Sequence, residues 1–517
     1  MKKFLCSKTE PVVQVAQGKL RGFFFDGVYR FLGVPYAKAR RFEMPEAPDA
    51  WEGTRNALAY GLICPVLKDL QVDDEIVVPH RIWPASEHCQ NLNIWTNSLD
   101  AGAKKPVMVW FHGGGFFNGS AIEHIAYEGE NLARYDDVVA VTINHRLNAF
   151  GHLDLSMFGE KYHNSVNAGI ADLVASLRWV KENIASFGGD PDNVTIFGQS
   201  GGGGKVTACG QAPSCDGLFQ KAIVMSGVFG GFRQQKPEAD PRAFALEILR
   251  QLELTEKDVD RLQTVETPLF IMAVNRAVDR MQSEGFSVRW APHPNDWYLG
   301  DPRVVGFREH YLTIPTMVGT VLAEFSPPVD YARGALTQEE QIRKVYEKFG
   351  EENGRRLLPL YRQAYPGKPD IYLNDVDTGA RGASMEYVRL KAKGPAPVYA
   401  YIMSSIFDYD GGRAAWHCAD IPYVFHNSAI IPYCYATENR ERLEKEMCGA
   451  FVQFARTGNP NHPQLPAWAP ATPTDVSTMV FDDKTEARVN FDDELIRALQ
   501  EASPAFTPHM PGRKKEG

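Results

Sequence analysis

The sequence lacks the long apolar runs of a membrane protein. At the N-terminus, the apolar stretch after Lys2 and Lys3 ends after three residues, too short for the core of a signal peptide. No other stretch approaches the roughly 20 apolar residues of a transmembrane helix. We therefore expect a cytoplasmic protein without a membrane span.

Cysteine is sparse and positive charge is not in excess. Eight cysteines scattered over 517 residues do not make a disulfide framework, and no pair has the spacing of a zinc site. A His-Glu-x-x-His motif is missing as well, so we expect no metal. The formal net charge of -9 is unfavourable for binding nucleic acid, and we expect no such partner.

A glycine-rich stretch from Phe197 to Thr207, FGQSGGGGKVT, allows two interpretations. A phosphate-binding loop needs a glycine, four residues, and then Gly-Lys followed by Ser or Thr. With Lys205 as that lysine, the first glycine would fall at Gln199 and the last position is Val206, so both ends fail. The motif Gly-x-Ser-x-Gly fits at 198–202 instead, which predicts that Ser200 is a nucleophile on a sharp turn from strand to helix.

Short, continuous apolar runs predict strands that are buried on both faces, as in a parallel sheet covered by helices. These runs lie at residues 107–111, 138–143, 194–197 and 222–225. Between the second and third runs, residues 167–187 have the apolar spacing of a helix and are followed by Gly188 and Gly189, a helix stop signal. Ser200 would thus follow a strand, as its motif requires. The glycines after it are poor helix formers, but they would let a helix pack closely against the sheet.

The stretch from His112 to Phe116, HGGGF, follows the first of these strands, where lipases and esterases carry an oxyanion-hole loop. Its glycines would let backbone N–H groups face a developing alkoxide, and each such donor is worth roughly 100- to 1,000-fold in rate. Taken alone, the stretch also fits a plain glycine turn. The triad order Ser, acid, His excludes none of the histidines after Ser200, which are His293, His310, His417, His426, His462 and His509.

Several motifs in the same order resemble the type-B carboxylesterases, the cholinesterase-like branch of the α/β-hydrolases, along nearly the whole chain. They are FLGVPYA at 31–37, EHCQNLNIW at 87–95, NHR at 144–146, FGGDP at 187–191 and the block around Ser200. The resemblance implies an α/β-hydrolase fold, with a large, mostly parallel central sheet flanked by helices and with helical insertions forming the active-site gorge. We expect residues 1–517 to form a single domain with a flexible tail at 508–517.

The same resemblance implies the other catalytic groups. GTVLAEF at 319–325 is similar to the acid motif of the family and implies Glu324 as the triad carboxylate. WHCADIPYVF at 416–425 is similar to its histidine motif and implies His417 as the base. The oxyanion N–H groups would come from Gly114, Gly115 and Gly201.

Three further pairs match structural features of the family. They are Ser226 and Asp420, a buried polar network behind the histidine; Arg146 and Asp172, a buried ion pair; and Cys64 and Cys89, the places of the first disulfide. Because a cytoplasmic chain keeps its thiols reduced, we expect that last pair to be unbonded.

Departures from the family bear on the substrate. Gln199 stands where a glutamate commonly precedes the nucleophile, which disfavours choline esters and favours a small to medium, uncharged or apolar ester. The segment from Cys64 to Cys89 is short, which suggests an open entrance. Candidates for the apolar pocket wall are Phe116, Phe117, Phe229, Phe232, Trp297 and Tyr298, with core packing as the alternative for each.

The sequence therefore predicts a serine carboxylesterase that forms an acyl-enzyme through a Ser-His-Glu triad. Its substrate would be a small-molecule ester, and the reaction needs no cofactor. A non-catalytic cholinesterase-like binding protein, and an amide or carbamate hydrolase with the same triad, are the alternatives; the presence of all three triad residues favours the enzyme. The physiological ester stays open, as does the choice between monomer and dimer.

Overall fold

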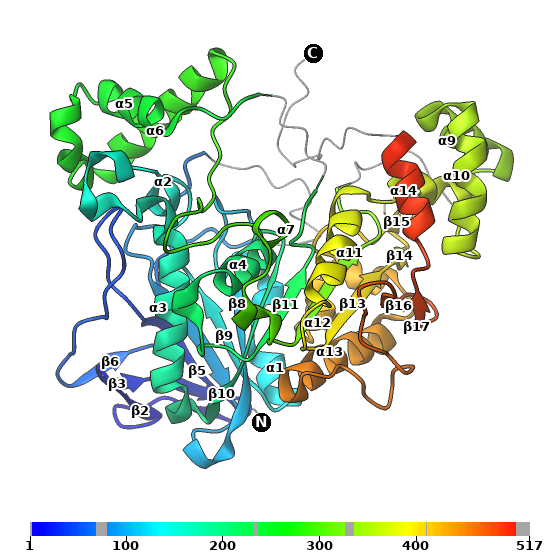
Figure 1. Cartoon of the computed structure of the whole chain (residues 1–517). Helices are drawn as coiled ribbons and strands as arrows, with labels where there is room; N and C mark the ends of the chain where they lie inside the picture. Colours follow the sequence, from blue (N-terminus) through cyan, green and yellow to red (C-terminus); the bar gives the residue numbers. More distant parts are fainter. Residues whose placement is uncertain (1–2, 69–79, 231–235, 326–334, 410, 503–517) are drawn as a thin grey trace. The chain divides into compact units, whose positions relative to one another are not determined.

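The computed structural model describes residues 3–68, 80–230, 236–325, 335–409 and 411–502 (Figure 1). The chain divides into two compact units. The first comprises Met1–Leu70, His80–Gln220 and Gln234–Arg308, and the second comprises Gln71–Pro79, Lys221–Arg233 and Glu309–Gly517. The single domain expected for 1–517 stays a prediction, and the tail expected at 508–517 lies outside the described residues.

The first unit is built on strands in the order β1-β4-β5-β7-β9-β8-β10. Strand β8 runs parallel to β9 on one side and to β10 on the other. The neighbouring pairs from β1 to β9 are antiparallel. A smaller sheet has the order β2-β3-β6. The strand bounds are β1 Phe4–Leu5, β2 Val12–Val15, β3 Gly18–Arg21, β4 Phe23–Phe25, β5 Val28–Pro35, β6 Thr54–Asn56, β7 Asn91–Thr96, β8 Lys105–Phe111, β9 Val139–Ile143 and β10 Gly189–Gln199.

The helices of the first unit confirm the predicted crossover from strand to helix to strand. The helix α3 connects β9 to β10 and, with the short turn η6 (Ile184–Phe187), ends at Gly188, whose φ of 78° is the left-handed helix stop that glycine favours. The helix α4 follows Ser200 and packs at the ends of β8 and β10 (Figure 1). The helix bounds are α1 Glu130–Tyr135, α2 Asn148–His152, α3 Ala168–Asn183, α4 Gly201–Gly210, α5 Pro241–Gln251, α6 Thr267–Ser283 and α7 Pro302–Val305.

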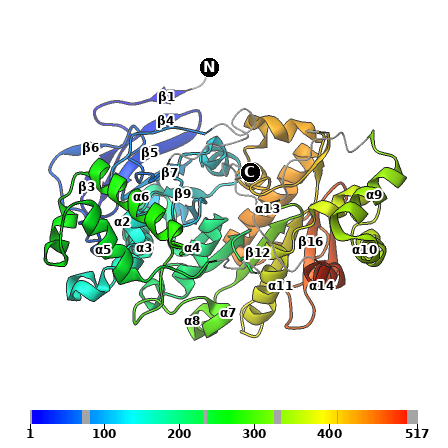
Figure 2. The same ribbon diagram turned by 90° about the horizontal axis from the view of Figure 1, so that it is seen from above.

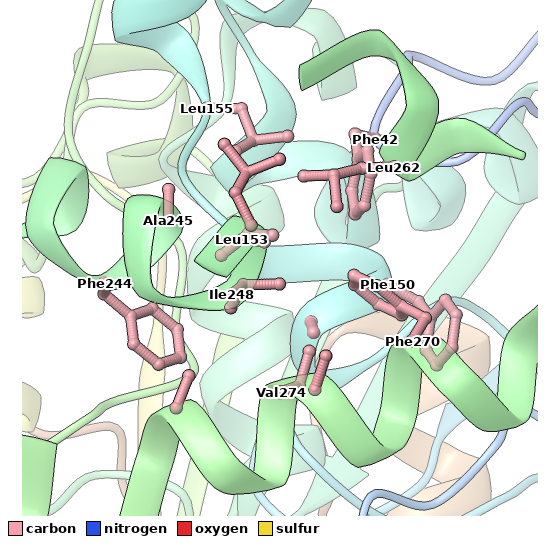
Figure 3. Packing of buried hydrophobic residues seen from close by; sticks show 14 of the residues in the cluster. Phe42, Phe150, Leu153, Leu155, Phe244, Ala245, Ile248, Leu262, Phe270 and Val274 are labelled. Atoms are coloured by element: carbon pink, nitrogen blue, oxygen red, sulfur yellow. The ribbon is translucent and has the colours of Figure 1, made fainter. Parts of the chain in front are cut away.

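A hydrophobic cluster in the first unit joins α2, α5 and α6 (Figure 3). Phe150 from α2 meets Phe270 from α6 edge to face, with ring centroids 5.3 Å apart, and Phe42 meets the same ring at 5.6 Å. Phe244 and Ile248 of α5 are buried in the same cluster. Burying such side chains contributes about 1.5–3 kcal/mol each, so this cluster holds α5 and α6 to the segment that follows β9.

The second unit carries the strands β11-β12-β13-β16-β17 in that order. The first four are parallel and β17 is antiparallel. A two-stranded ribbon pairs β14 with β15. The strand bounds are β11 Lys221–Met225, β12 Thr316–Val321, β13 Val398–Met403, β14 Ile406–Phe407, β15 Arg413–Ala414, β16 Ser477–Phe481 and β17 Glu486–Val489.

Helices flank this second set of strands. The helix α11 contacts β12 and β13, and the neighbouring helices α9, α10 and α14 share a second hydrophobic cluster (Figure 2). The helix bounds are α8 Glu309–Leu312, α9 Gln338–Phe349, α10 Glu351–Ala364, α11 Gly379–Lys391, α12 Ile421–Val424, α13 Arg440–Thr457 and α14 Asp493–Ala502. Among the residues described in either unit, no helix combines the length and the apolar character needed to cross a lipid bilayer.

Candidate active site

Ser200 stands alone between β10 and α4, as the nucleophile motif predicts. Its φ of 59° and ψ of -127° lie in a region that side chains with a Cβ avoid, so the backbone of this residue is strained. Ser200 is half-buried, whereas both of its neighbours, Gln199 and Gly201, are buried. Its carbonyl oxygen accepts the N–H of Gly204 at 3.1 Å and so begins the helix. The strain thus occurs at the residue expected to carry the reactive hydroxyl.

Glycines are needed around Ser200 because the backbone passes very close to β8. A Cβ at Gly202 would lie 2.0 Å from the carbonyl oxygen of Phe111, and one at Gly198 would lie 2.5 Å from the carbonyl carbon of Gly202. A Cβ at Gly201 would lie 2.3 Å from the carbonyl oxygen of Gly115. These clashes explain why glycine occupies these three positions: the backbone lies too close to the end of β8 and to the glycine loop for a Cβ.

The glycine loop from His112 to Phe116 lies directly beside the serine. A Cβ at Gly113 would be 3.5 Å from the Cβ of Ser200. Gly114 and Gly115 have φ of 78° and 63° and are half-buried, unlike the buried Gly113. The first unit therefore brings the three glycines predicted for the oxyanion hole together with the predicted nucleophile.

Asn148 holds the far end of this loop. Its backbone N–H donates to the carbonyl oxygen of Phe116 at 2.8 Å, and its side-chain Nδ2 donates to that of Phe117 at 3.0 Å. Asn148 itself has a φ of 46°, which asparagine tolerates better than most residues. Both phenylalanines are half-buried and continue the loop as candidate pocket wall.

Glu324 and His417 lie together in the second unit. Glu324 follows β12 and is 2% exposed, and its Oε2 is 2.6 Å from Nδ1 of His417. Its other oxygen, Oε1, accepts the backbone N–H of Val321 at 3.0 Å. The N–H of His417 donates to the carbonyl oxygen of Glu324 at 2.9 Å, so backbone and side chain fix the pair twice. A proton on Nδ1 is needed for the bond to the carboxylate, which leaves Nε2 of the neutral ring as a proton acceptor.

Two aromatic rings cover the histidine. The ring of Phe325 lies 4.3 Å from that of His417, centroid to centroid and tilted by 34°, and the ring of Phe229 lies at 6.3 Å. Phe229 and Phe325 are themselves 5.7 Å apart. Since hydrogen bonds to charged groups strengthen where water is excluded, this apolar cover reinforces the bond between Glu324 and His417.

Two more buried carboxyl groups lie near Glu324. Asp420 is fully buried and accepts the hydroxyl of Tyr401 at 2.8 Å. Burial raises the pKa of Asp420 to about 6, with Glu324 adding to the rise, while the bond from Tyr401 opposes it. Burial likewise raises the pKa of Asp377 to about 7, again with a contribution from Glu324 and opposed by backbone N–H groups at the start of α11.

Ser226, predicted to join Asp420 in a polar network, is fully buried at the end of β11. Its backbone N–H donates to the carbonyl oxygen of Gly319 at 2.7 Å. Within the described part of the chain, neither the Ser226 hydroxyl nor Oδ1 of Asp420 has a hydrogen-bond partner. The two residues are thus buried polar groups, and a network that joins them stays a prediction.

The remaining candidates have separate surroundings. His426, the neighbour of His417 on the shortlist, has its Nε2 3.8 Å from a carboxylate oxygen of Glu444. Trp297 and Tyr298 belong to a loop in which both backbone N–H groups donate to Oδ1 of Asn295. The side chain of Asn295 also accepts from Nδ2 of Asn167 and donates to Oδ1 of Asn164. Phe232 lies outside the described residues.

The other two pairs expected to be structural, Arg146 with Asp172 and Cys64 with Cys89, are buried as well. Two guanidinium nitrogens of Arg146 bond the carboxylate of Asp172 at 2.9 and 2.7 Å, which confirms the ion pair. Cys64 and Cys89 are buried free thiols, and Sγ of Cys64 accepts the backbone N–H of Leu147 at 3.3 Å.

Asn148, Phe325 and Asp377 were not predicted from the sequence as residues of the site. Phe325 is the last residue of the acid motif, so its place next to His417 could have been considered. Asp377 is followed by Thr378 and Gly379, which at most signals a helix start. No pattern in the sequence connects Asp377 to Glu324 or Asn148 to the glycine loop, because these contacts depend on the tertiary fold.

Comparison with known proteins identifies the family of the chain. The model of the "Carboxylesterase family" matches residues 9–498. A para-nitrobenzyl esterase of Bacillus subtilis is 32% identical over 474 residues, covering 88% of this chain and 91% of its own length. Carboxylesterase 3B of Mus musculus is 30% identical over 486 residues, covering 85% and 80%.

A solved structure is more similar still. It is an esterase from the anaerobe Clostridium hathewayi, described as able to hydrolyse aliphatic aromatic polyesters. It superposes with a TM-score of 0.93 at 45% identity, covering 97% of this chain and all of the other. The chain therefore belongs to the carboxylesterase family, whose members are serine ester hydrolases with the α/β-hydrolase fold.

Proposed function

We propose that this protein hydrolyses neutral carboxylic esters through an acyl-enzyme on Ser200, with His417 as general base and Glu324 as its carboxylate partner. The observation that carries the proposal is the strained backbone of Ser200 next to a glycine loop with positive φ angles. Such strain at a residue with a nucleophilic side chain is typical of a functional position. Membership of a serine esterase family supports the same assignment.

The proposed reaction proceeds in two acyl transfers. His417 accepts the hydroxyl proton of Ser200 through Nε2 while the serine oxygen attacks the ester carbonyl. The alkoxide that forms receives hydrogen bonds from the N–H groups of Gly114, Gly115 and Gly201. His417 then gives the proton to the departing alcohol. In the second step, water loses a proton to His417 as it attacks the acyl-enzyme. His417 then returns this proton to the departing oxygen of Ser200, and the carboxylic acid is released.

The bond between Glu324 and His417 supports these roles. A carboxylate 2.6 Å from Nδ1 stabilises the charged imidazolium that exists in each transition state, and it orients the ring so that Nε2 can accept and return the proton. The carboxylate is held from its other side by the N–H of Val321. The position of the Glu324 carboxylate is thus fixed by its own loop as well as by the bond to His417.

The surroundings favour an uncharged substrate with apolar parts. The residue before the nucleophile, Gln199, is neutral and fully buried, so it offers a cationic alcohol no counter-charge. The half-buried rings of Phe116 and Phe117 continue the glycine loop, and Phe229 stands beside His417. Since the Clostridium hathewayi esterase is described as acting on aliphatic aromatic polyesters, we include short aliphatic aromatic oligoesters in the proposed substrate class.

A fluorophosphonate probe with mass mapping tests the nucleophile. The probe should label Ser200 in the native protein, and Ser200→Ala should lower kcat by roughly a million-fold, as for other serine hydrolases. Glu324→Gln should lower kcat by roughly ten-thousand-fold, because the neutral amide no longer favours the charged, correctly oriented imidazole. Labelling of a different serine, or retained turnover in Ser200→Ala, would refute the assignment.

A substrate panel tests the class. Nitrophenyl esters of increasing acyl length, choline esters, an aliphatic aromatic oligoester, and matched amides and carbamates are compared by kcat/KM. Neutral esters should exceed both the choline esters and the amides. Preference for the amides or carbamates would support the alternative hydrolase, and the absence of turnover with every member would support a binding protein.

A further inference from the structure

Lys205 is a buried lysine next to the loop that carries the proposed oxyanion donors. It lies in α4, five residues after Ser200, and is 0% exposed. Its Nζ donates to the carbonyl oxygen of His112 at 2.9 Å and to that of Gly113 at 3.4 Å. Lys205, which does not fit a phosphate-binding motif, instead donates to the backbone of the glycine loop.

The carbonyl of Gly113 accepts from a second donor. Nδ1 of His112 is 2.9 Å from the carbonyl oxygen of Gly113 and donates to it. A Cβ at Gly119 would lie 2.6 Å from this Nδ1, 2.9 Å from the Gly113 oxygen and 3.0 Å from Oε1 of Glu123. A carboxyl group, an imidazole and the held carbonyl thus gather around one glycine. Burial lowers the pKa of Lys205 to about 7, and Glu123 opposes this fall.

The direction of a carbonyl determines the direction of the next N–H. In a planar trans peptide, the C=O of one residue and the N–H of the following residue point in opposite directions. The carbonyl of Gly113 is drawn toward Lys205 and His112, so the N–H of Gly114 points away from them. That N–H is one of the donors assigned to the oxyanion.

Glycine makes such a restraint necessary. Peptides between glycines rotate readily, because no Cβ restricts φ and ψ on either side. The peptide from Gly113 to Gly114 has glycine at both ends, so its own sequence does not favour one orientation. The N–H donors of Lys205 and His112 supply this restraint, and a hydrogen bond is stronger in the protein interior than in water.

We propose that Lys205 is a positioning residue that fixes the peptide between Gly113 and Gly114, so that the N–H of Gly114 faces the oxyanion of the reaction. The inference rests on the proposed function, because it assumes the oxyanion hole. Lys205 touches neither the substrate nor the reacting atoms, and its effect passes through the backbone of the loop. Its removal should therefore weaken transition-state binding more than substrate binding.

Lys205→Met tests the proposal, since it keeps the length of the side chain and removes the donor. Loss of one oxyanion donor costs roughly 100- to 1,000-fold in kcat. A peptide that samples both orientations loses the donor only part of the time, so the kcat of Lys205→Met should fall by about tenfold or more. KM should change little. The inhibition constant of a trifluoromethyl ketone, which forms an anionic tetrahedral adduct with the serine, should rise by a factor similar to the fall in kcat.

The chain offers a matched control in Lys391. It is also 0% exposed, and its Nζ also donates to two backbone carbonyls, those of Tyr311 at 2.6 Å and Ile314 at 2.9 Å. Lys391→Met should lower stability to a similar degree, because it too removes a buried amino group from two carbonyls. It should leave kcat unchanged when kcat is expressed per serine titrated to completion by a fluorophosphonate.

The outcomes separate this proposal from the proposed function. Lys205 has no positioning role if Lys205→Met keeps kcat per titrated serine and ketone affinity within about threefold of the wild type, or if Lys391→Met loses as much of both. If Lys205→Met does not fold, Lys205→Gln, which retains one N–H donor, is judged by the same criteria. Failure of the wild type itself to bind the ketone and label at Ser200 would refute the proposed function instead.

Discussion

Asp420 should make the protein less stable as the pH rises, and replacing it with asparagine should remove that effect. The carboxyl group is fully buried, with one oxygen bonded to the hydroxyl of Tyr401 and the other without a partner among the described residues. An asparagine fits the same space: its oxygen accepts from Tyr401, and its NH2 group occupies the unpartnered side. The substitution removes an ionisation and changes little else.

The size and sign follow from the pKa. Burial raises the pKa of Asp420 from 3.8 to about 6, so between these values the folded protein keeps a proton that the unfolded chain releases. Stability from this group is therefore complete below the lower value and is lost as the pH rises through the higher one. The full loss is about 3 kcal/mol, of which about 1.4 kcal/mol falls between pH 5 and pH 8.

Urea unfolding of the wild type and Asp420→Asn, measured side by side from pH 5 to pH 8, isolates the effect. Other titrating groups are common to both proteins and cancel in the difference of the two unfolding free energies. That difference should shift in favour of the variant by about 1.4 kcal/mol as the pH rises. A constant difference would show that the pKa of Asp420 is not raised, and a shift toward the wild type would show that it is lowered.

Two further predictions concern the first unit. Arg146→Met leaves the carboxylate of Asp172 buried without its counter-charge and should lower the free energy of unfolding in urea by about 3–5 kcal/mol. The double variant with Asp172→Leu should recover much of that stability, and a single variant as stable as the double one would contradict this. Gln199→Glu adds a negative charge before the nucleophile and should raise the ratio of kcat/KM for choline esters to kcat/KM for neutral isosteres by about tenfold at low salt. An unchanged ratio would rule out control of charge selectivity by residue 199.

The strands that were predicted from the sequence are buried on both faces, but β7, β12, β13 and β16 are also buried throughout and were not predicted. The apolar runs at 107–111 and 138–143 are within one or two residues of β8 and β9, because every position of such a strand must be apolar. The strand β10 begins at Gly189, well before its apolar run at 194–197, and its pairing with β8 shifts register over this stretch. The antiparallel margins were not predicted. Strands such as β17, Glu486–Val489, are only partly buried, so their sequences carry no continuous apolar signal.

The site divides along the same physical line. Ser200 and the loop from His112 to Phe116 were predicted from local motifs, since a sharp turn and a glycine-lined backbone both require particular residues within a few positions. The pairing of His417 with Glu324 spans 93 residues of sequence. Neighbouring residues do not encode that distance, and reasoning from the residues alone left a shortlist of histidines, which only the family resemblance narrowed.

Lys205 shows why motif and geometry give different kinds of information. Three consecutive glycines indicate that a loop can present its N–H groups to an anion, but the same freedom leaves the direction of those groups undetermined. The direction must come from bonds made by other parts of the chain, and here the bonding lysine lies 93 residues after His112. Oxyanion stabilisation depends on donors that are oriented before the reaction begins. The property that makes such a loop useful in catalysis is therefore a tertiary one, and in this protein we assign it to a buried lysine that belongs to no recognised motif.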